Sequence, residues 1–101
     1  MDPFRFESTI IYWRGPSPFF YAPLPQDLAD EVQRMARSVT YGWGMIPVDA
    51  TIKNVTWYTA LFPKDGTYLL PIKAAVRRKA DVTVGDMIAV AMTLKPGGRR
   101  G

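Results

Sequence analysis

The pair of side chains best suited to chemistry is Lys73 and Arg77, which stand four residues apart. This spacing places both cations on the same side of a helix. An arginine binds a carboxylate or a phosphate through its planar guanidinium, and a lysine adds a second positive charge. Thr59 and Tyr58, on an expected neighbouring strand, would help to hold an anion. The sequence therefore predicts an anion-binding pair. The alternative is that Lys73 and Arg77 only cover the solvent face of a short helix.

One of the three tryptophans, Trp43, stands in an expected loop between Gly42 and Gly44. A loop tryptophan can stack on a flat ligand or cover the mouth of a barrel. The alternative is a tryptophan that folds down and seals the core, with the glycines allowing the turn. We expect a binding module in which Trp43, Lys73 and Arg77 converge on a small anionic or aromatic ligand.

Three consecutive cations, Arg77, Arg78 and Lys79, give a second hypothesis from a different class, nucleic-acid binding through the helix that carries them. The tail arginines Arg99 and Arg100 would then add further phosphate contacts. A net charge of +4 makes an anionic partner more favourable than a cationic one. A third function class, a protein-interaction domain that uses residues 15–25 as an extended edge, stays open.

The absence of cysteine and histidine removes several kinds of chemistry at once. Disulfides, thiolate nucleophiles, Ser-His-Asp catalysis and imidazole-bound zinc all need one of these two residues. The carboxylates are scattered over helix starts, turns and strands, and no glycine-rich phosphate loop or calcium loop is present. We therefore expect a protein that is not an enzyme and that needs no cofactor and no metal.

Alternation of apolar and polar residues predicts mainly strands and a small α+β domain. The clearest case has Ile46, Val48, Ala50 and Ile52 on one face of a strand. One domain is expected over residues 1–94, followed by a flexible basic tail over 95–101. The expected strands are 4–13, 19–22, 45–53, 56–62, 67–71 and 87–94, and the expected helices are about 25–37 and 72–80.

The same periodicities predict which faces are buried. In the first strand the apolar face is assigned to Phe4, Phe6, Ser8, Ile10 and Tyr12. Helical spacing assigns two further stripes to the core, Leu28, Val32, Met35 and Ala36 in the first helix and Ile72, Val76 and Ala80 in the second.

Three short segments carry turn residues. Lys53 and Asn54 form an expected hairpin tip, because asparagine tolerates a positive φ. Residues 63–66, Pro-Lys-Asp-Gly, form a second turn with proline and glycine in favoured positions. Gly85 and Asp86 form a third, in which the aspartate side chain accepts a bond from nearby backbone.

Two strand-proline-helix units resemble each other, with Leu24-Pro25 aligned on Leu70-Pro71. This echo predicts a pseudo-duplicate in which each half gives strands and one helix. The two helices would then cap opposite ends of a shared barrel. Six strands closed into a barrel would leave no free edges. The order of elements in residues 70–90 also resembles the swapped-hairpin barrels of the AbrB type.

A set of residues spread over the region from Phe4 to Leu94 carries a second resemblance. They are Pro25, Gly42-Trp43-Gly44, Pro47-Val48, Trp57, Thr59, Leu61-Phe62-Pro63, Tyr68-Leu69-Leu70-Pro71, Lys73, Arg77 and Gly85-Asp86. In these residues the chain resembles the bacterial family called domain of unknown function DUF1905. The resemblance implies a small double-split β-barrel with a helix at each end, and it implies no established activity.

No apolar run in the sequence approaches the roughly 20 residues that a membrane-spanning helix needs. Asp2, Arg5 and Glu7 interrupt the N-terminal segment before the apolar region of a secretory signal could form. We therefore expect a cytoplasmic protein without a membrane partner.

Overall fold

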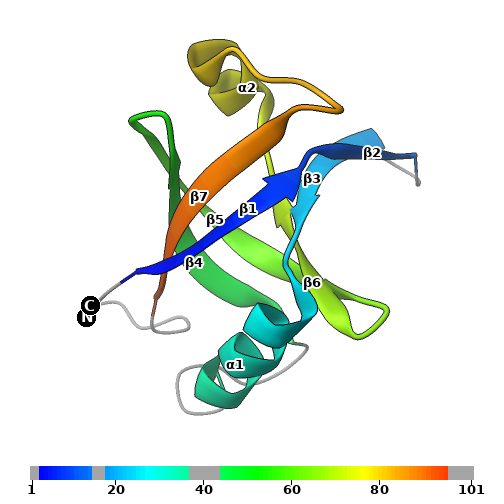
Figure 1. Cartoon of the computed structure of the whole chain (residues 1–101), viewed down its shortest axis with the longest axis vertical. Helices are drawn as coiled ribbons and strands as arrows, with labels where there is room; N and C mark the ends of the chain where they lie inside the picture. The colour runs from blue at the N-terminus through cyan, green and yellow to red at the C-terminus, as the bar shows by residue number, and fades with distance from the viewer. Residues whose placement is uncertain (1–2, 15–17, 37–43, 96–101) are drawn as a thin grey trace.

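One curled antiparallel sheet forms the body of the protein, and a helix lies at each of its two ends (Figure 1). The computed structural model describes residues 3–14, 18–36 and 44–95. Within these residues the sheet has seven strands, in the order β1-β7-β4-β5-β6-β3-β2. The elements are β1 (Phe4–Thr9), β2 (Ile11–Arg14), β3 (Pro18–Pro23), α1 (Gln26–Ala36), β4 (Ile46–Ile52), β5 (Val55–Lys64), β6 (Thr67–Pro71), α2 (Ala74–Ala80) and β7 (Met87–Leu94).

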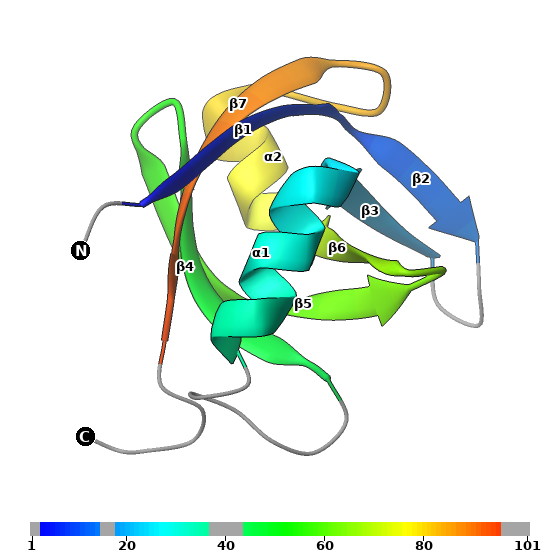
Figure 2. The same cartoon turned by 60° about the horizontal axis from the view of Figure 1, so that its bottom comes forward.

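The expected first strand, 4–13, is in fact two strands that part at Ile10. The Ile10 amide donates to the carbonyl of Asp86 at 2.9 Å, and its carbonyl accepts from the Gly85 amide at 2.8 Å. The chain bends at this point, so that β1 pairs with β7 and β2 pairs with β3. The mainly β, small α+β class is confirmed. The prediction of six strands in a closed barrel is wrong, because this bend gives seven strands in a curled half-barrel whose edge strands are β1 and β2 (Figure 2).

The core lies inside the curl, and β4 supplies its most regular part. Ile46, Val48, Ala50 and Ile52 are all buried, as their alternation predicts. Tyr12 departs from the prediction because it is 46% exposed. The bend at Ile10 ends the alternation that would have turned Tyr12 inward. The residues after the bend form β2, which pairs with β3.

Helix α1 buries two of the four residues expected in its apolar stripe, Val32 and Ala36, and buries Ala29 in place of Leu28. Its buried residues are Ala29, Val32 and Ala36, whereas Met35 is 37% exposed and Leu28 is only partly buried. A helix face that contains Ala29 and Val32 turns Met35 toward the rim of the contact. Small alanines allow the helix backbone to lie close to the end of the sheet.

Helix α2 begins two residues later than expected, at Ala74, because Lys73 is still extended (φ −66°, ψ 155°). The Ile72 amide donates to the carbonyl of Phe20 in β3 at 2.9 Å, so this residue extends the sheet contact instead of starting the helix. Ile72, Val76 and Ala80 are buried, as the helical spacing predicts. The chain segment between β6 and α2 is therefore anchored on its apolar side.

The turn at Lys53 and Asn54 has the predicted bounds, and both residues have positive φ, 45° and 69°. The turn expected at Gly85 and Asp86 begins earlier, because the Asp86 amide donates to the Thr83 carbonyl at 3.1 Å. As predicted, the aspartate side chain accepts a backbone bond, from the Thr83 amide at 2.8 Å. The turn expected at residues 63–66 is shorter than predicted. Positive φ is confined to Asp65 and Gly66, because the preceding residues 63–64 continue β5 and pair with β6.

A substitution at Gly66 tests how strongly this turn depends on a positive φ. Gly66 has φ +83°, and a Cβ atom there would meet nothing within 4 Å. The Gly66→Ala variant should therefore lose about 1 kcal/mol of unfolding free energy through backbone strain alone. Urea denaturation followed by circular dichroism measures the loss. Asn54→Gly is the matched control and should be nearly neutral, since glycine fits its φ of 69°. Equal stabilities of Gly66→Ala and wild type would contradict the argument.

The internal echo agrees with the register of the sheet. Aligning Leu24 with Leu70 also sets Pro23 against Leu69, and these two residues face each other in the β3–β6 pair. Equivalent positions pair with each other where a pseudo-two-fold axis passes between them. Each half then supplies strands, one helix and a final strand, and α1 and α2 lie at opposite ends in Figure 1.

Candidate functional site

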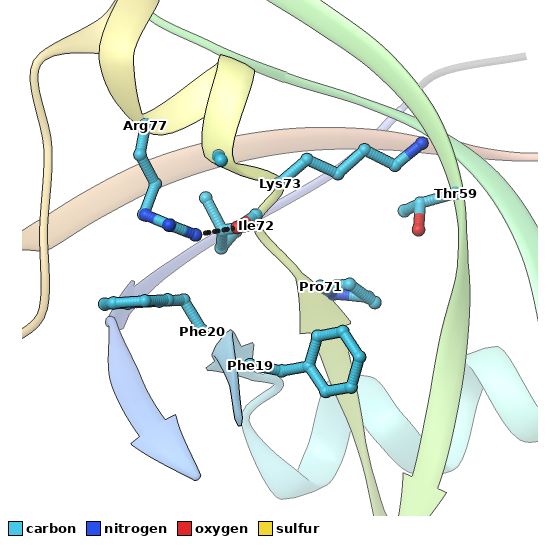
Figure 3. Close-up of a pocket in the computed structure, with 8 residues that line it drawn as sticks. Phe19, Phe20, Thr59, Pro71, Ile72, Lys73 and Arg77 are labelled. Carbon is cyan, nitrogen blue, oxygen red and sulfur yellow. Dashed lines mark hydrogen bonds between the residues drawn. The ribbon is translucent and has the colours of Figure 1, made fainter. Parts of the chain in front are cut away.

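A pocket of about 500 Å³ lies beside the start of α2, and Figure 3 shows its lining. Its walls come from β3, from β5, from the end of β6 and from α2. Most of the lining is apolar, and the polar groups are one hydroxyl and two cations. The lining residues are Phe19, Phe20, Thr59, Pro71, Ile72, Lys73, Ala74 and Arg77.

The pocket forms where β5 and the end of β6 take different partners. The pairing between β5 and β6 extends from Lys64 to Phe62, and the preceding part of β5 pairs with β4. The end of β6 pairs with β3 instead, with Pro71 opposite Tyr21. The indole nitrogen of Trp57 donates to the carbonyl of Pro71 at 3.1 Å and links the diverging strands. Burial raises the pKa of the neighbouring Tyr21 phenol above its ordinary value.

Arg77 is held in one orientation at the edge of the pocket. One of its Nη atoms donates to the carbonyl of Ile72 at 2.7 Å. Its guanidinium carbon lies 3.6 Å from the centre of the Phe20 ring, a cation–π contact. The carbonyl bond uses one of the five N–H groups of a guanidinium. The ring and the carbonyl together fix the plane in which the remaining donors lie.

Lys73 is exposed, and its ammonium donates to the carbonyl of Tyr58 in β5 at 2.9 Å. Figure 3 shows the two cations extending to opposite sides of Ile72, Lys73 toward Thr59 and Arg77 toward Phe20. The structure thus brings the predicted pair to one pocket without making the two charges meet at one point.

Thr59 and Tyr58 are adjacent in β5, but their side chains point to opposite faces of the strand. Thr59 is partly buried and lines the pocket with its side chain. The Tyr58 side chain is 57% exposed, and this residue takes part through its carbonyl, which accepts from Lys73. Alternation along a strand accounts for the difference.

Trp43 and the flanking Gly42 lie outside the described residues, so its convergence with the two cations stays a prediction. The tail arginines Arg99 and Arg100 and residues 15–17 of the expected interaction edge also lie outside them. Gly44, the other glycine beside Trp43, stands two residues before β4 and has φ +89°.

The three cations assigned to nucleic-acid binding divide between two surfaces. Arg77 is partly buried and turned toward Phe20, whereas Arg78 and Lys79 are exposed on α2. The lining of the pocket and the solvent face of the helix therefore carry separate positive charges.

The opposite end of the sheet has the reverse charge. The alignment of Leu24 with Leu70 makes Asp27 the counterpart of Lys73 and Glu31 the counterpart of Arg77. Asp27 and Glu31 line a second pocket, of about 440 Å³, together with Pro25, Leu28 and three residues of β1. The pocket at the α1 end is thus lined by three carboxylates, Glu7, Asp27 and Glu31, and one cation, Arg5, whereas the α2 pocket is lined by two cations. Among the described lining residues of the α2 pocket there is no carboxylate.

Sequence reasoning did not assign Phe19, Phe20, Pro71, Ile72 or Ala74 to a site. The signal that would have found the phenylalanines is an aromatic pair in a short strand, but only the β3–β6 register places that strand beside α2. Across the described ranges no cluster of three or more carboxylates is arranged to hold a metal ion. In the same ranges no helix is long and apolar enough to cross a membrane.

Comparison with known proteins places the chain in a family. No curated protein matches it. A family model described as a domain of unknown function, DUF1905, matches residues 6–92, which is most of the chain and contains both helices and the whole α2 pocket. The chain therefore belongs to the DUF1905 family of domains of unknown function.

Proposed function

We propose that this domain is a binding module for a small anionic molecule, held in the pocket beside α2. The observation that carries the proposal is the pairing of two cations, Lys73 and Arg77, with an apolar lining that has no carboxylate among its described residues. Two ion pairs are found in the described residues, Lys64–Asp65 and Lys95–Asp49, and neither includes one of the two pocket cations.

The contacts of the two cations support an anionic ligand over a neutral one. Both are hydrogen-bonded to carbonyls, which orient the cations without neutralising their charge. An anion would form charge-assisted hydrogen bonds with them, which are about twice as strong as bonds between neutral groups. The Thr59 hydroxyl would add a further donor at the same rim. The lining offers no pair of carboxylates for general acid and base work, which supports binding rather than catalysis.

Benzoate is a suitable first probe, because it combines one carboxylate with a flat apolar ring. Titrated into the labelled protein, it should shift the amide resonances of residues 71–77 and Thr59. The Arg77→Gln variant should bind benzoate about tenfold more weakly, since a charge-assisted hydrogen bond is lost. Native mass spectrometry of freshly purified protein would show whether an endogenous anion is retained.

Arg78→Gln is the matched control, because Arg78 lies next to Arg77 but is exposed and does not line the pocket. It should leave benzoate affinity unchanged. Arg77→Lys keeps the positive charge and should keep part of the benzoate affinity. It therefore shows whether the loss in Arg77→Gln comes from the missing charge or from a disturbed fold. The proposal fails if benzoate shifts no pocket resonance, or if both arginine-to-glutamine variants weaken binding equally.

The alternative, nucleic-acid binding, is supported by the exposure of Arg78 and Lys79 together with the net charge of +4. Binding through phosphates must weaken with salt, with a log–log slope of about −0.9 per neutralised phosphate of duplex DNA. A labelled duplex titrated at two ionic strengths tests it. Salt-sensitive binding lost in Arg78→Gln and Lys79→Gln would favour this alternative, and no binding at low salt would remove it.

A further inference from the structure

We infer that the ligand of the α2 pocket carries two separate anionic groups, one at each end of a flat apolar body. This inference rests on the proposed function and adds the chemical class of the ligand. It comes from the directions of the two cations and from the apolar surface beside them.

The two cations are placed for two anions instead of one. In Figure 3 the Arg77 guanidinium lies on the Phe20 side of Ile72, and the Lys73 ammonium lies on the side of Thr59. A single carboxylate that lies against the Arg77 guanidinium is therefore turned away from Lys73. A second anionic group on the same molecule would reach the lysine.

Each cation is also held where it is by its own carbonyl. Arg77 donates to Ile72 at 2.7 Å and stacks on Phe20, and Lys73 donates to Tyr58 at 2.9 Å. The two carbonyl bonds direct the two charges to different parts of the pocket. A ligand with two anionic groups uses both cations as they stand, and preorganised donors of this kind favour affinity.

Apolar groups make up the wall of the pocket beside the two cations. Phe19 and Pro71 contribute accessible surface to it, since Phe19 is 48% exposed and Pro71 is partly buried. Figure 3 shows the Phe19 ring and Pro71 together on the same side of the two cations. Covering these groups with a flat apolar body would remove apolar surface from water, whereas a polar body would lose its hydration there without gaining partners.

The other end of the molecule is unsuited to the same ligand. Asp27 and Glu31 occupy the positions that correspond to Lys73 and Arg77. With Glu7 they outnumber the single cation of that pocket, Arg5, and would repel two anionic groups. Each protein chain should therefore bind one molecule of such a ligand, at the α2 end, although the internal repeat relates the two ends.

Terephthalate and benzoate are the probes that separate two anionic groups from one, since they share the flat ring. Wild-type protein should bind terephthalate on the order of fivefold more tightly than benzoate, the size expected for one added exposed ion pair. The Lys73→Gln variant should remove that advantage, because it should weaken terephthalate more than benzoate. Arg77→Gln should weaken both ligands. Isothermal titration calorimetry measures the affinities and the stoichiometry, and amide shifts locate the site.

Lys79→Gln is the matched control for Lys73→Gln, because it removes an exposed lysine of α2 that does not line the pocket. Thermal unfolding of every variant checks that the fold is kept. Equal affinities of wild type for terephthalate and benzoate would overturn the inference and leave the proposed function intact. An equal fold-loss of terephthalate and benzoate affinity in Lys73→Gln would also overturn the inference and leave the proposed function intact. Failure of both ligands to bind at millimolar concentration would overturn the inference and the proposed function together.

Discussion

Replacing Met92 by alanine should lower the unfolding free energy of the protein by about 3 kcal/mol, because buried methionine-to-alanine changes cost about 2–5 kcal/mol. Met92 is 0% exposed in β7. It stands opposite Phe4 of β1 on one side and Ala50 of β4 on the other. The small neighbour Ala50 has no side chain long enough to fill the space left behind, so that a cavity should remain. Chemical denaturation followed by circular dichroism measures the loss.

The same strand offers a matched control in Met87, which is 64% exposed. Met87→Ala removes the same atoms from the same element, so strand propensity changes equally in both variants. We expect it to change stability by less than about 0.5 kcal/mol. Similar losses in the two variants would show that Met92 does not stand in a closely packed core.

Replacing Trp57 by phenylalanine should cost about 2 kcal/mol of stability and should also weaken anion binding. Trp57 is 8% exposed, and its indole N–H donates to the Pro71 carbonyl at 3.1 Å. Phenylalanine is smaller and has no donor, so that the carbonyl of Pro71 loses its partner. Because Pro71 lines the pocket, the diverging ends of β5 and β6 should move and disturb the site.

Trp13→Phe serves as the control for Trp57→Phe. Trp13 is partly buried in β2, packs at an angle against Tyr21 and Phe62, and has the Lys64 ammonium 4.5 Å from its ring centre. A phenylalanine keeps much of this packing, so we expect a loss of less than about 1 kcal/mol. Benzoate affinity should not change. The role assigned to Trp57 is wrong if its variant binds benzoate like wild type.

Strand β4 and the hairpin that follows it were predictable because their determinants are local. The alternation of Ile46 to Ile52 gives the buried face, and the positive φ at Lys53 and Asn54 gives the turn. The bend at Ile10 was not predictable in this way. Its cause is a pair of backbone bonds to the turn at Gly85 and Asp86, far away in the sequence.

The site was only partly predictable for the same reason. Lys73 and Arg77 could be recognised from their spacing along a helix. Their directions could not, because they depend on the carbonyls of Tyr58 and Ile72 and on the ring of Phe20. These partners lie on three different segments. Long, flexible cationic side chains take their directions from such partners and not from the local backbone.

The sequence by itself determined the mainly β class, the two helices, the internal echo and the pair of cations Lys73 and Arg77 at the start of α2 and within it. These features follow from residue type, periodicity and turn chemistry, which act over a few neighbouring residues. Only the tertiary structure decided that the sheet has seven strands in a half-barrel and that Phe19 and Phe20 line a pocket with Arg77. Strand register and backbone hydrogen bonds between distant segments set these features, and they form only when the whole chain has folded.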